Sequence, residues 1–341
     1  MRVLLIIGGQ STENEVSRMS AQNIYKNIDK KHDVKVLGIS KDGIWYELKN
    51  MIFTSDNWLE DASIVRDTLT YIRTFDVAFP ILHGKFGEDG TIQGLLELAG
   101  ISYVGMNVMS SSIALNKVYT KILLKNYNIN MVPSLYIKKK KDSFVIINDD
   151  FEEDENILDN VKKKFGYPVF VKASNQGSSV GCYKVESEDE LYNKLKMAGS
   201  YDDKILIEKA INAKELEVAV LGNDDVLVSN VGEILPHGEF YTYDSKYNDE
   251  ESKVLIPANI TDEESEYIRK TSKKIFKILD GHGLSRCDFF KDKDTGKIYF
   301  NEINTMPGFT NISMYPMLIE NMGINGTELI ERLIFLALEK K

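Results

Sequence analysis

Residues 285–304 have the sequence SRCDFFKDKDTGKIYFNEIN, which predicts two strands joined by a turn at 294–296. Side chains two positions apart in a strand face the same side, so Arg286 shares a face with Asp288, as Glu302 does with Asn304. The turn can bring these two pairs together. Apolar residues flank both pairs. We therefore expect the charges to be partly buried and to need partners.

This face of the hairpin carries candidate ligands for a metal ion. Two carboxylates and an amide oxygen are hard donors of the kind that Mg²⁺ takes together with substrate phosphates. Asp288, Glu302 and Asn304 are therefore candidate metal ligands, with Arg286 beside them. The alternative is a structural cluster in which Arg286 neutralises the carboxylates, and both interpretations are compatible with the spacing.

The whole chain of 341 residues is 43% hydrophobic and 28% charged, with a net charge of −10. At roughly 150 residues per domain this predicts two or three domains with real cores and excludes wholesale disorder. The acidic balance disfavours non-specific nucleic-acid binding. Two cysteines exclude a disulfide framework and disfavour a cysteine-based zinc site. No apolar run is long enough for a signal peptide or a membrane span, so we expect a cytoplasmic protein.

The first part of the chain alternates apolar, β-branched runs with helical patterns. The predicted strands cover residues 3–7, 32–40, 75–82 and 101–105. A helix is predicted over 17–26, and another over 112–127. This βαβ rhythm predicts an α/β, doubly wound domain with a parallel sheet, whose functional loops lie at the carboxyl ends of the strands.

From Tyr167 onward, short strands with tight turns predict antiparallel α+β structure. Helices are predicted over 262–279 and 327–338. The chain has neither GxxxxGK[ST] nor a strand-linked GxGxxG. These absences argue against a P-loop and against a simple dinucleotide-binding dehydrogenase.

Two loops in the first part are candidate functional sites. HGKFGEDGTIQG at 83–94 follows a strand and leads into a helix, so His83 and Glu88 are candidates, although a lone histidine is often structural. GGQSTENEVS at 8–17 follows the first strand and places Glu15 near a helix start. The alternative for Glu15 is a carboxylate that only favours the helix N-terminus.

Three later segments are also candidates. PVFVKASNQGSSVGCYKV at 168–185 delivers Lys172 and a Ser-Gly loop that could cradle phosphate, or it is an ordinary hairpin turn. In ILIEKAINAKELEVAV at 205–220, the backbone after the strand could bind the edge of a base, and a glutamate could bind a ribose. The alternative is that the glutamates lie on a solvent-facing side of a strand. Residues 239–249 are a lid or a tyrosine-rich surface loop.

HGKFGEDGTIQG, SRCDFF and FNEINTMPGFT, in this order and spacing, resemble the D-alanine–D-alanine ligases of the ATP-grasp superfamily. The resemblance covers essentially the whole chain. It implies an N-terminal doubly wound substrate domain at 1–116 and a two-domain ATP-grasp module. The central domain of that module would span 117–207, and the C-terminal domain 208–341 with a lid loop at 239–253. It further implies ATP-dependent joining of two D-alanines through a D-alanyl phosphate, for peptidoglycan precursor synthesis.

The family's functional residues carry over by motif. For the first D-alanine the resemblance implies Glu15, Ser178 and Tyr247, with His83 and Glu88 in the same pocket. For the second it implies Lys246 and Ser313. For ATP it implies Lys117 and Lys172 at the phosphates, Glu208, Lys209 and Ile211 at the adenine edge, Phe240 on the base and Glu215 at the ribose. For two Mg²⁺ or Mn²⁺ ions it implies Asp288, Glu302 and Asn304, and for the reacting carboxyl oxygen Arg286 and the backbone of Gly308.

Some positions depart from the commoner family pattern. Asn116 precedes Lys117 where Asp is usual, 173–176 differ from the usual run, and Ile312 stands where His is frequent. Ile312 keeps a D-alanine–D-serine ligase open as an alternative, whereas Tyr247 weighs against D-lactate. A catalytically silent nucleotide-binding protein of this fold is the other alternative. The family also implies a homodimer.

Overall fold

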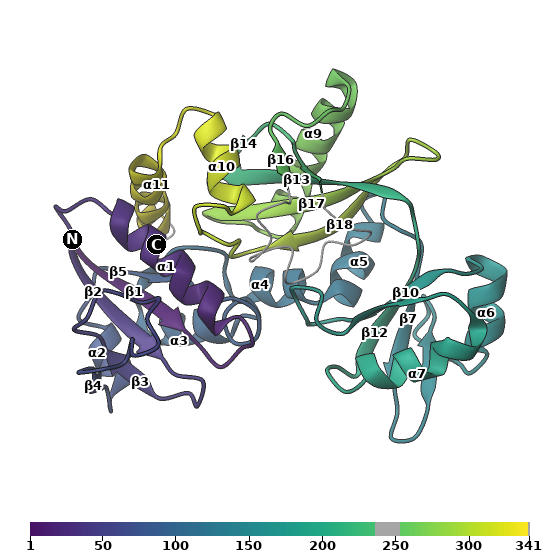
Figure 1. Cartoon of the computed structure of the whole chain (residues 1–341), viewed down its shortest axis with the longest axis horizontal. Helices are drawn as coiled ribbons and strands as arrows, with labels where there is room; N and C mark the ends of the chain where they lie inside the picture. The colour runs from purple at the N-terminus through teal and green to yellow at the C-terminus, as the bar shows by residue number, and fades with distance from the viewer. Residues whose placement is uncertain (236–252, 340–341) are drawn as a thin grey trace.

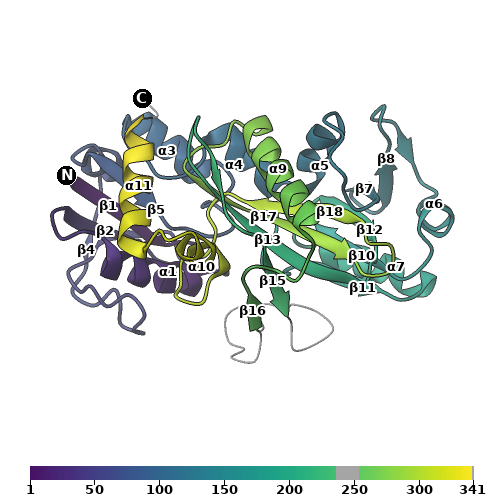
Figure 2. The same ribbon diagram turned by 90° about the horizontal axis from the view of Figure 1, so that it is seen from above.

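The computed structural model describes residues 1–235 and 253–339, which form three β-sheets flanked by helices (Figure 1). The N-terminal sheet and the central sheet lie at opposite ends of the molecule, and the C-terminal sheet lies between them (Figure 2). Within the two described ranges, no helix has the length and apolar character needed to cross a bilayer.

The N-terminal sheet has the strand order β4-β3-β2-β1-β5-β6. Its pairs β1–β2, β1–β5 and β5–β6 are parallel, which confirms the predicted parallel sheet. Strands β3 and β4 add an antiparallel edge to it. The strands are β1 (Arg2–Gly8), β2 (Asp33–Ile39), β3 (Trp45–Glu47), β4 (Ser63–Ile64), β5 (Val77–Pro80) and β6 (Ser102–Tyr103). The helices are α1 (Asn14–Asn27), α2 (Thr68–Ile72) and α3 (Thr91–Ala99).

The single helix predicted over 112–127 is wrong, because two helices occupy this region. They are α4 (Val108–Leu115) and α5 (Lys117–Lys125). Asn116 between them has extended backbone, and its side chain accepts a hydrogen bond from the Tyr119 N–H at 3.0 Å. Asn116 therefore ends one helix and caps the next. As a result, Lys117 stands at the first position of α5.

The central sheet is antiparallel throughout, as predicted, with the order β11-β10-β12-β7-β8-β9. Its strands are β7 (Ser134–Lys139), β8 (Phe144–Ile147), β9 (Glu153–Asp154), β10 (Val169–Ala173), β11 (Cys182–Val185) and β12 (Lys204–Lys209). Helices α6 (Ile157–Lys164) and α7 (Glu188–Ala198) pack their apolar sides into its core. Strand β12 (Lys204–Lys209) runs across residue 207, the predicted boundary between the second and third domains.

The C-terminal sheet has the order β16-β15-β13-β17-β18, with β14 on β13. The predicted hairpin is confirmed as β17 and β18, joined at the predicted turn. The strands are β13 (Ala213–Leu221), β14 (Leu227–Val228), β15 (Gly232–Leu235), β16 (Lys253–Leu255), β17 (Leu284–Asp292) and β18 (Ile298–Asn304). The helices are α9 (Asp262–Ile278), α10 (Met314–Asn321) and α11 (Gly326–Glu339).

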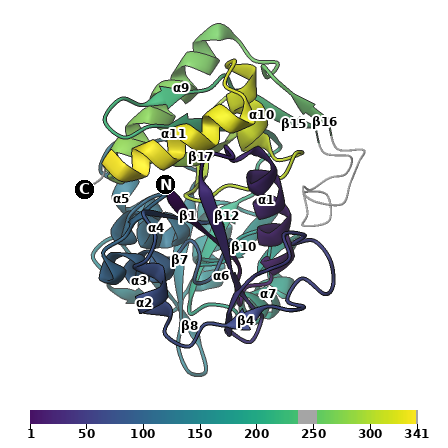
Figure 3. The ribbon, with the colours of Figure 1, turned by 90° about the vertical axis from the view of Figure 1, so that its left-hand side faces the viewer.

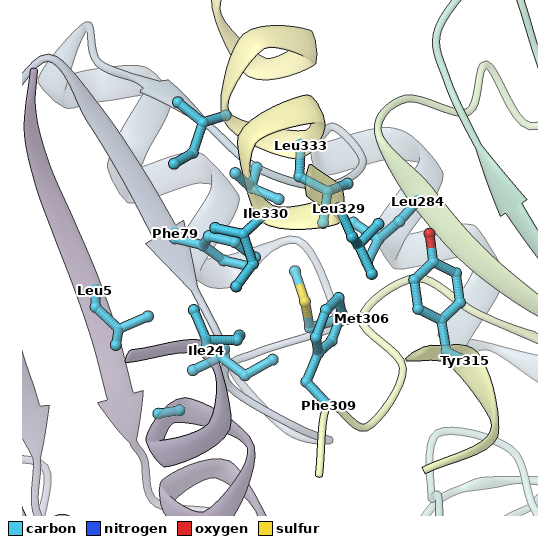
Figure 4. Packing of buried hydrophobic residues seen from close by; sticks show 14 of the residues in the cluster. Leu5, Ile24, Phe79, Leu284, Met306, Phe309, Tyr315, Leu329, Ile330 and Leu333 are labelled. Carbon is cyan, nitrogen blue, oxygen red and sulfur yellow. The ribbon is translucent and has the colours of Figure 1, made fainter. Parts of the chain in front are cut away.

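The two ends of the chain share one hydrophobic core. Helix α11 lies over the N-terminal sheet beside α1 (Figure 3). Phe79 of β5 meets Phe309 edge to face, with ring centroids 6.2 Å apart, and Phe309 in turn contacts Tyr315 of α10 (Figure 4). Because these rings are buried, the segment after β18 is fixed against the N-terminal sheet.

Candidate active site

Three adjacent strands bring the charged residues of the hairpin together. Asp288 lies opposite Glu302 across the hairpin and opposite Glu217 on β13. The Arg286 guanidinium donates to both oxygens of Asp288, at 2.7 and 2.8 Å. It also lies 2.9 Å from the Glu217 carboxylate, and the Asn304 amide donates to Asp288 at 2.9 Å. The predicted grouping of Arg286, Asp288, Glu302 and Asn304 is therefore present, and Glu217 belongs to it as well.

This grouping suits a cation that also binds phosphate. Asp288 and Glu302 are in register on neighbouring strands, so their oxygens point to one region, and Lys117 lies 3.1 Å from Glu302. Within the described ranges no three acidic, histidine or cysteine side chains form a metal cage by themselves. Mg²⁺ commonly binds through one or two carboxylates and completes its shell with substrate phosphates and water. The oxygen donors present here match that kind of binding.

A cavity of about 90 Å³, the smaller cavity, opens beside these charges. Its polar lining includes Glu13, His83, Glu88, Lys117, Ser178, Glu217, Arg286, Glu302, Asn304 and Ser313. The backbone of Gly308 and the side chain of Ile312 complete the wall on the C-terminal side. All three parts of the fold therefore contribute to one small, polar chamber.

The lining corrects one predicted residue, because Glu13 and not Glu15 belongs to the smaller cavity. The Glu15 side chain is 64% exposed and lies 3.6 Å from Lys41. Glu13 is buried and accepts a hydrogen bond from the Ser178 hydroxyl. The reason is helical geometry. Glu13 directly precedes α1 and lies in line with Ser17 and Ser20 on the buried face of the helix, whereas Glu15 lies on the solvent-facing side.

The loop after β5 holds its two predicted residues inside the protein. His83 is buried, with Nδ1 at 3.1 Å from the Met306 carbonyl. Burial lowers the pKa of His83, which favours the neutral ring. Glu88 accepts hydrogen bonds from Gly84 N–H at 2.7 Å and from Met306 N–H at 3.3 Å. Both residues thus join the N-terminal sheet to the segment after β18.

The burial of Glu88 predicts a pH-dependent stability. Burial, aided by the nearby Glu13 carboxylate, raises the pKa of Glu88 from 4.5 to about 8. A raised carboxyl pKa stabilises the fold below the ordinary pKa, and that contribution is lost as the pH rises through the folded-state pKa. The free energy of unfolding should therefore fall between pH 4.5 and about 8, by up to about 1.4 kcal/mol per pH unit.

Denaturant titrations across this pH range test the expectation. Glu88→Gln removes the titrating proton, so its stability should lose this part of the pH dependence. Parallel profiles for the two proteins would contradict the assignment of the proton to Glu88.

A second, larger cavity of about 370 Å³ lies between the central and C-terminal sheets. Its apolar lining includes Val132, Phe170, Val180, Ile211 and Phe290. Its polar lining includes Lys117, Lys172, Lys184, Glu208, Lys209, Glu215 and Glu302. An apolar slot with cations at one side suits a flat base that carries a charged phosphate chain. Phe170 and Phe290 lie in the segments 168–185 and 285–304, but neither residue was predicted for this site.

The larger cavity has a buried ion cluster in its wall. Glu208 lies 2.6 Å from the Lys172 amine and 2.5 Å from the Lys121 amine, and Lys121 also donates to the Val132 carbonyl at 2.8 Å. Burial would raise the pKa of Glu208, but the two lysines outweigh it and lower the pKa to about 2. Glu208 is thus buried rather than on a solvated strand face. Lys121, one helical turn after Lys117, was not predicted.

The two cavities meet at four residues. Lys117, Gly177, Ser178 and Glu302 line both of them. Ser178 and Ser179 have left-handed backbone, with φ of 48° and 62°, which turns the Ser-Gly loop sharply at this point. The Ser178 bond to Glu13 fixes this loop to α1. A group held in one cavity can therefore touch a group held in the other.

Some predicted residues lie outside the described ranges. They are Phe240, Lys246 and Tyr247, together with the lid loop up to residue 252. Gly308 and Ser313 lie in the smaller cavity, where the Ser313 hydroxyl accepts a hydrogen bond from Thr310 N–H at 3.0 Å. Lys209, Ile211 and Glu215 lie in the larger one.

Comparison with known proteins gives consistent matches along the chain. The family "D-ala D-ala ligase N-terminus" matches residues 2–106, and "D-ala D-ala ligase C-terminus" matches residues 123–335. The chain is 47% identical to a D-alanine–D-alanine ligase of Acetivibrio thermocellus, which covers 99% of this chain and 96% of the relative. It is 45% identical to the corresponding ligase of Clostridium novyi, over 99% and 98% of the two chains.

Solved structures agree with these relatives. The VanG D-Ala:D-Ser ligase of Enterococcus faecalis superposes with a TM-score of 0.86 at 33% identity, covering 98% of this chain and 99% of that one. The D-alanine–D-alanine ligase of Coxiella burnetii superposes with a TM-score of 0.87 at 32% identity, covering 100% and 94%. The two family models and the full-length relatives show that the chain belongs to the D-alanine–D-alanine ligase family.

Proposed function

We propose that the protein joins two D-alanines to D-alanyl-D-alanine at the expense of ATP, for peptidoglycan precursor synthesis. The observation that carries the proposal is the meeting of the two cavities at Lys117, Ser178 and Glu302. The larger cavity has the lining for a nucleotide, and the smaller one has the polar lining for amino acids. The phosphoryl group to be transferred would lie at their junction.

The reaction has two steps. A carboxylate oxygen of the first D-alanine attacks the γ-phosphorus of ATP, the bond to ADP breaks, and D-alanyl phosphate forms. The amine of the second D-alanine then attacks the acyl carbon and loses a proton, and inorganic phosphate leaves. Both steps develop charge on oxygen, so positioning and electrostatic stabilisation are the main demands on the protein.

The residues of the junction suit these demands. Glu13, held by Ser178, would bind the ammonium group of the first D-alanine, beside His83 and Glu88. Lys117 and Lys172 would hold phosphate oxygens, and Arg286 with the Gly308 backbone would stabilise the reacting carboxyl oxygen.

Metal and nucleotide assignments extend the proposal. Asp288, Glu302 and Asn304 would hold two Mg²⁺ or Mn²⁺ ions. When bound, these ions would neutralise negative charge on the phosphates. Lys209, Ile211 and Glu215 would contact the adenosine, with Phe240 on the base. Lys246 and Ser313 would bind the second amino acid, Tyr247 would complete the first site, and the loop 239–253 would close as a lid.

Phosphate release from Mg-ATP tests the activity. D-alanine should stimulate release, and mass spectrometry should identify D-alanyl-D-alanine as the main product. Nucleotide binding without any stimulation by D-alanine would instead indicate a catalytically silent protein.

A D-alanine–D-serine ligase is the second candidate. Ile312 lines the smaller cavity, is 54% exposed, and stands where the family often has His. Competition between D-alanine and D-serine for the second position decides between the two substrates. A dominant mixed product would move the proposal to D-serine.

We also propose that the enzyme acts in the cytoplasm as a homodimer, as members of the family do. Sedimentation at several protein concentrations measures the oligomeric state, and a monomer at all of them would contradict the homodimer.

A further inference from the structure

Helix α1 presents two buried serines one turn apart. Ser17 and Ser20 are both fully buried on the side of α1 that faces the protein. Ser17 accepts a hydrogen bond from Gly8 N–H at 2.8 Å and donates to the Ile81 carbonyl, so it joins strands of the N-terminal sheet. Ser20 instead reaches the segment after β18, because its hydroxyl accepts from Phe309 N–H at 3.1 Å.

The groups that can only accept hydrogen bonds determine where the hydrogens of His83 and Ser20 lie. The Met306 carbonyl can only accept, so the His83 Nδ1 at 3.1 Å must carry the hydrogen. In a neutral ring Nε2 then accepts, and the Ser20 hydroxyl, 3.2 Å away, supplies the donor. The result is a continuous chain of hydrogen bonds. It runs from Phe309 N–H through the Ser20 hydroxyl and the His83 ring to the Met306 carbonyl.

The same chain holds both sides of Gly308. Met306 N–H donates to Glu88 at 3.3 Å, and the Asn23 amide donates to the Phe309 carbonyl at 2.8 Å. The backbone groups of Met306 and Phe309 are thus bound by the N-terminal domain. Gly308 lies between them in the wall of the smaller cavity.

We propose that Ser20 is a positioning residue of the ligation: its hydroxyl fixes the segment 306–309 and holds the Nε2 side of the His83 ring. It thereby holds the Gly308 backbone where the carboxyl oxygen reacts. This inference rests on the proposed function. Ser20 contacts no substrate itself, and it acts through Phe309 and His83.

Ser20→Ala tests the proposal, with Ser17→Ala as the matched control. Both variants lose a buried hydroxyl from the same helix, so both should unfold at a lower temperature than the unchanged protein. Only Ser20→Ala should lower kcat for D-alanine-dependent phosphate release, by about 10- to 100-fold, since small displacements of a reacting geometry have effects of this size. KM for ATP should stay constant, because the segment 306–309 does not line the larger cavity.

A second readout does not depend on activity. The chain has four histidines, so ¹⁵N-histidine NMR can follow His83 after assignment. In the unchanged protein and in Ser17→Ala, Nδ1 should carry the proton, and Ser20→Ala should shift the Nε2 resonance. Should Ser20→Ala fail to fold, Asn23→Ala removes the neighbouring bond to Phe309 and should also lower kcat. Equal kcat in Ser20→Ala and Ser17→Ala, or an Nε2-protonated ring in the unchanged protein, overturns the proposal.

The two proposals fail in different ways. Absence of D-alanine-dependent phosphate release in the unchanged protein refutes the proposed function. The NMR measurement in that case still decides whether the Ser20 hydroxyl donates a hydrogen bond to Nε2 of His83.

Discussion

Asp288→Asn and Glu302→Gln should each lower D-alanine-dependent phosphate release by about 10³-fold, while the protein stays folded. Each substitution keeps the shape of the side chain and removes one negative charge. Phosphoryl transfer depends on positioning and on neutralising charge, so loss of a carboxylate from the cation site should act on turnover. The neighbouring cations, Arg286 beside Asp288 and Lys117 beside Glu302, cannot replace that function.

The control for these variants is Glu264→Gln. Glu264 forms an ion pair with Lys291 on strand β17, at 2.7 Å, outside the two cavities. Glu264→Gln should change the free energy of unfolding and leave the turnover number unchanged. Circular dichroism establishes folding, and the Mn²⁺ affinity in the presence of nucleotide, measured by electron paramagnetic resonance, reports the metal site directly. Turnover like that of the unchanged protein in both carboxylate variants would refute the metal assignment.

Glu208→Gln should have the largest effect on stability. It removes the carboxylate that lies between the amines of Lys121 and Lys172. Breaking a buried pair by removing one partner typically destabilises by about 3–5 kcal/mol, because the remaining charge stays buried without compensation. ATP affinity should fall as well, since Lys172 loses its fixed position.

The pH dependence gives this prediction a signature. A carboxyl pKa lowered from 4.5 to about 2 stabilises the fold above the ordinary value, and the contribution is lost as the pH falls through the folded-state pKa. The stability difference between the two proteins should therefore shrink as the pH falls from 4.5 toward 2. Denaturant titrations measure it.

Asp149→Asn is the matched control for Glu208→Gln. It removes the partner of Lys125 on the same helix α5, where both side chains are mostly exposed, at 62% and 83%. Exposed pairs contribute little, so its unfolding should match that of the unchanged protein. If Glu208→Gln loses no more stability than Asp149→Asn, the prediction that Glu208 compensates the buried lysine charges is wrong.

Local patterns predicted those parts of the site that depend on a single element. The face shared by Arg286 and Asp288 follows from the period of a strand, and the turn at 294–296 brought it to Glu302. Glu13 could also have been found, because its spacing of four and seven residues to Ser17 and Ser20 marks the buried face of α1. The predicted Glu15 is out of step with that periodicity, and its side chain is exposed.

Other parts of the site depend on contacts between distant elements. Nothing in the pattern of α5 distinguishes buried Lys121 from exposed Lys125, because the difference comes from strand β12 beside the helix. Phe170 and Phe290 lie on two sheets and form one slot only after these pack. The break at Asn116 depends on a side-chain cap that competes with a continuous helical pattern.

The core shared by the two ends of the chain has a consequence during synthesis on the ribosome. Strand β6 ends at Tyr103, but α11, which covers the same sheet, begins at Gly326. At a synthesis rate of about 5–20 residues per second, the apolar side of the nascent sheet stays exposed for on the order of ten to forty-five seconds before α11 is made. During that interval it is a surface for chaperones to bind, and for other nascent chains to aggregate with.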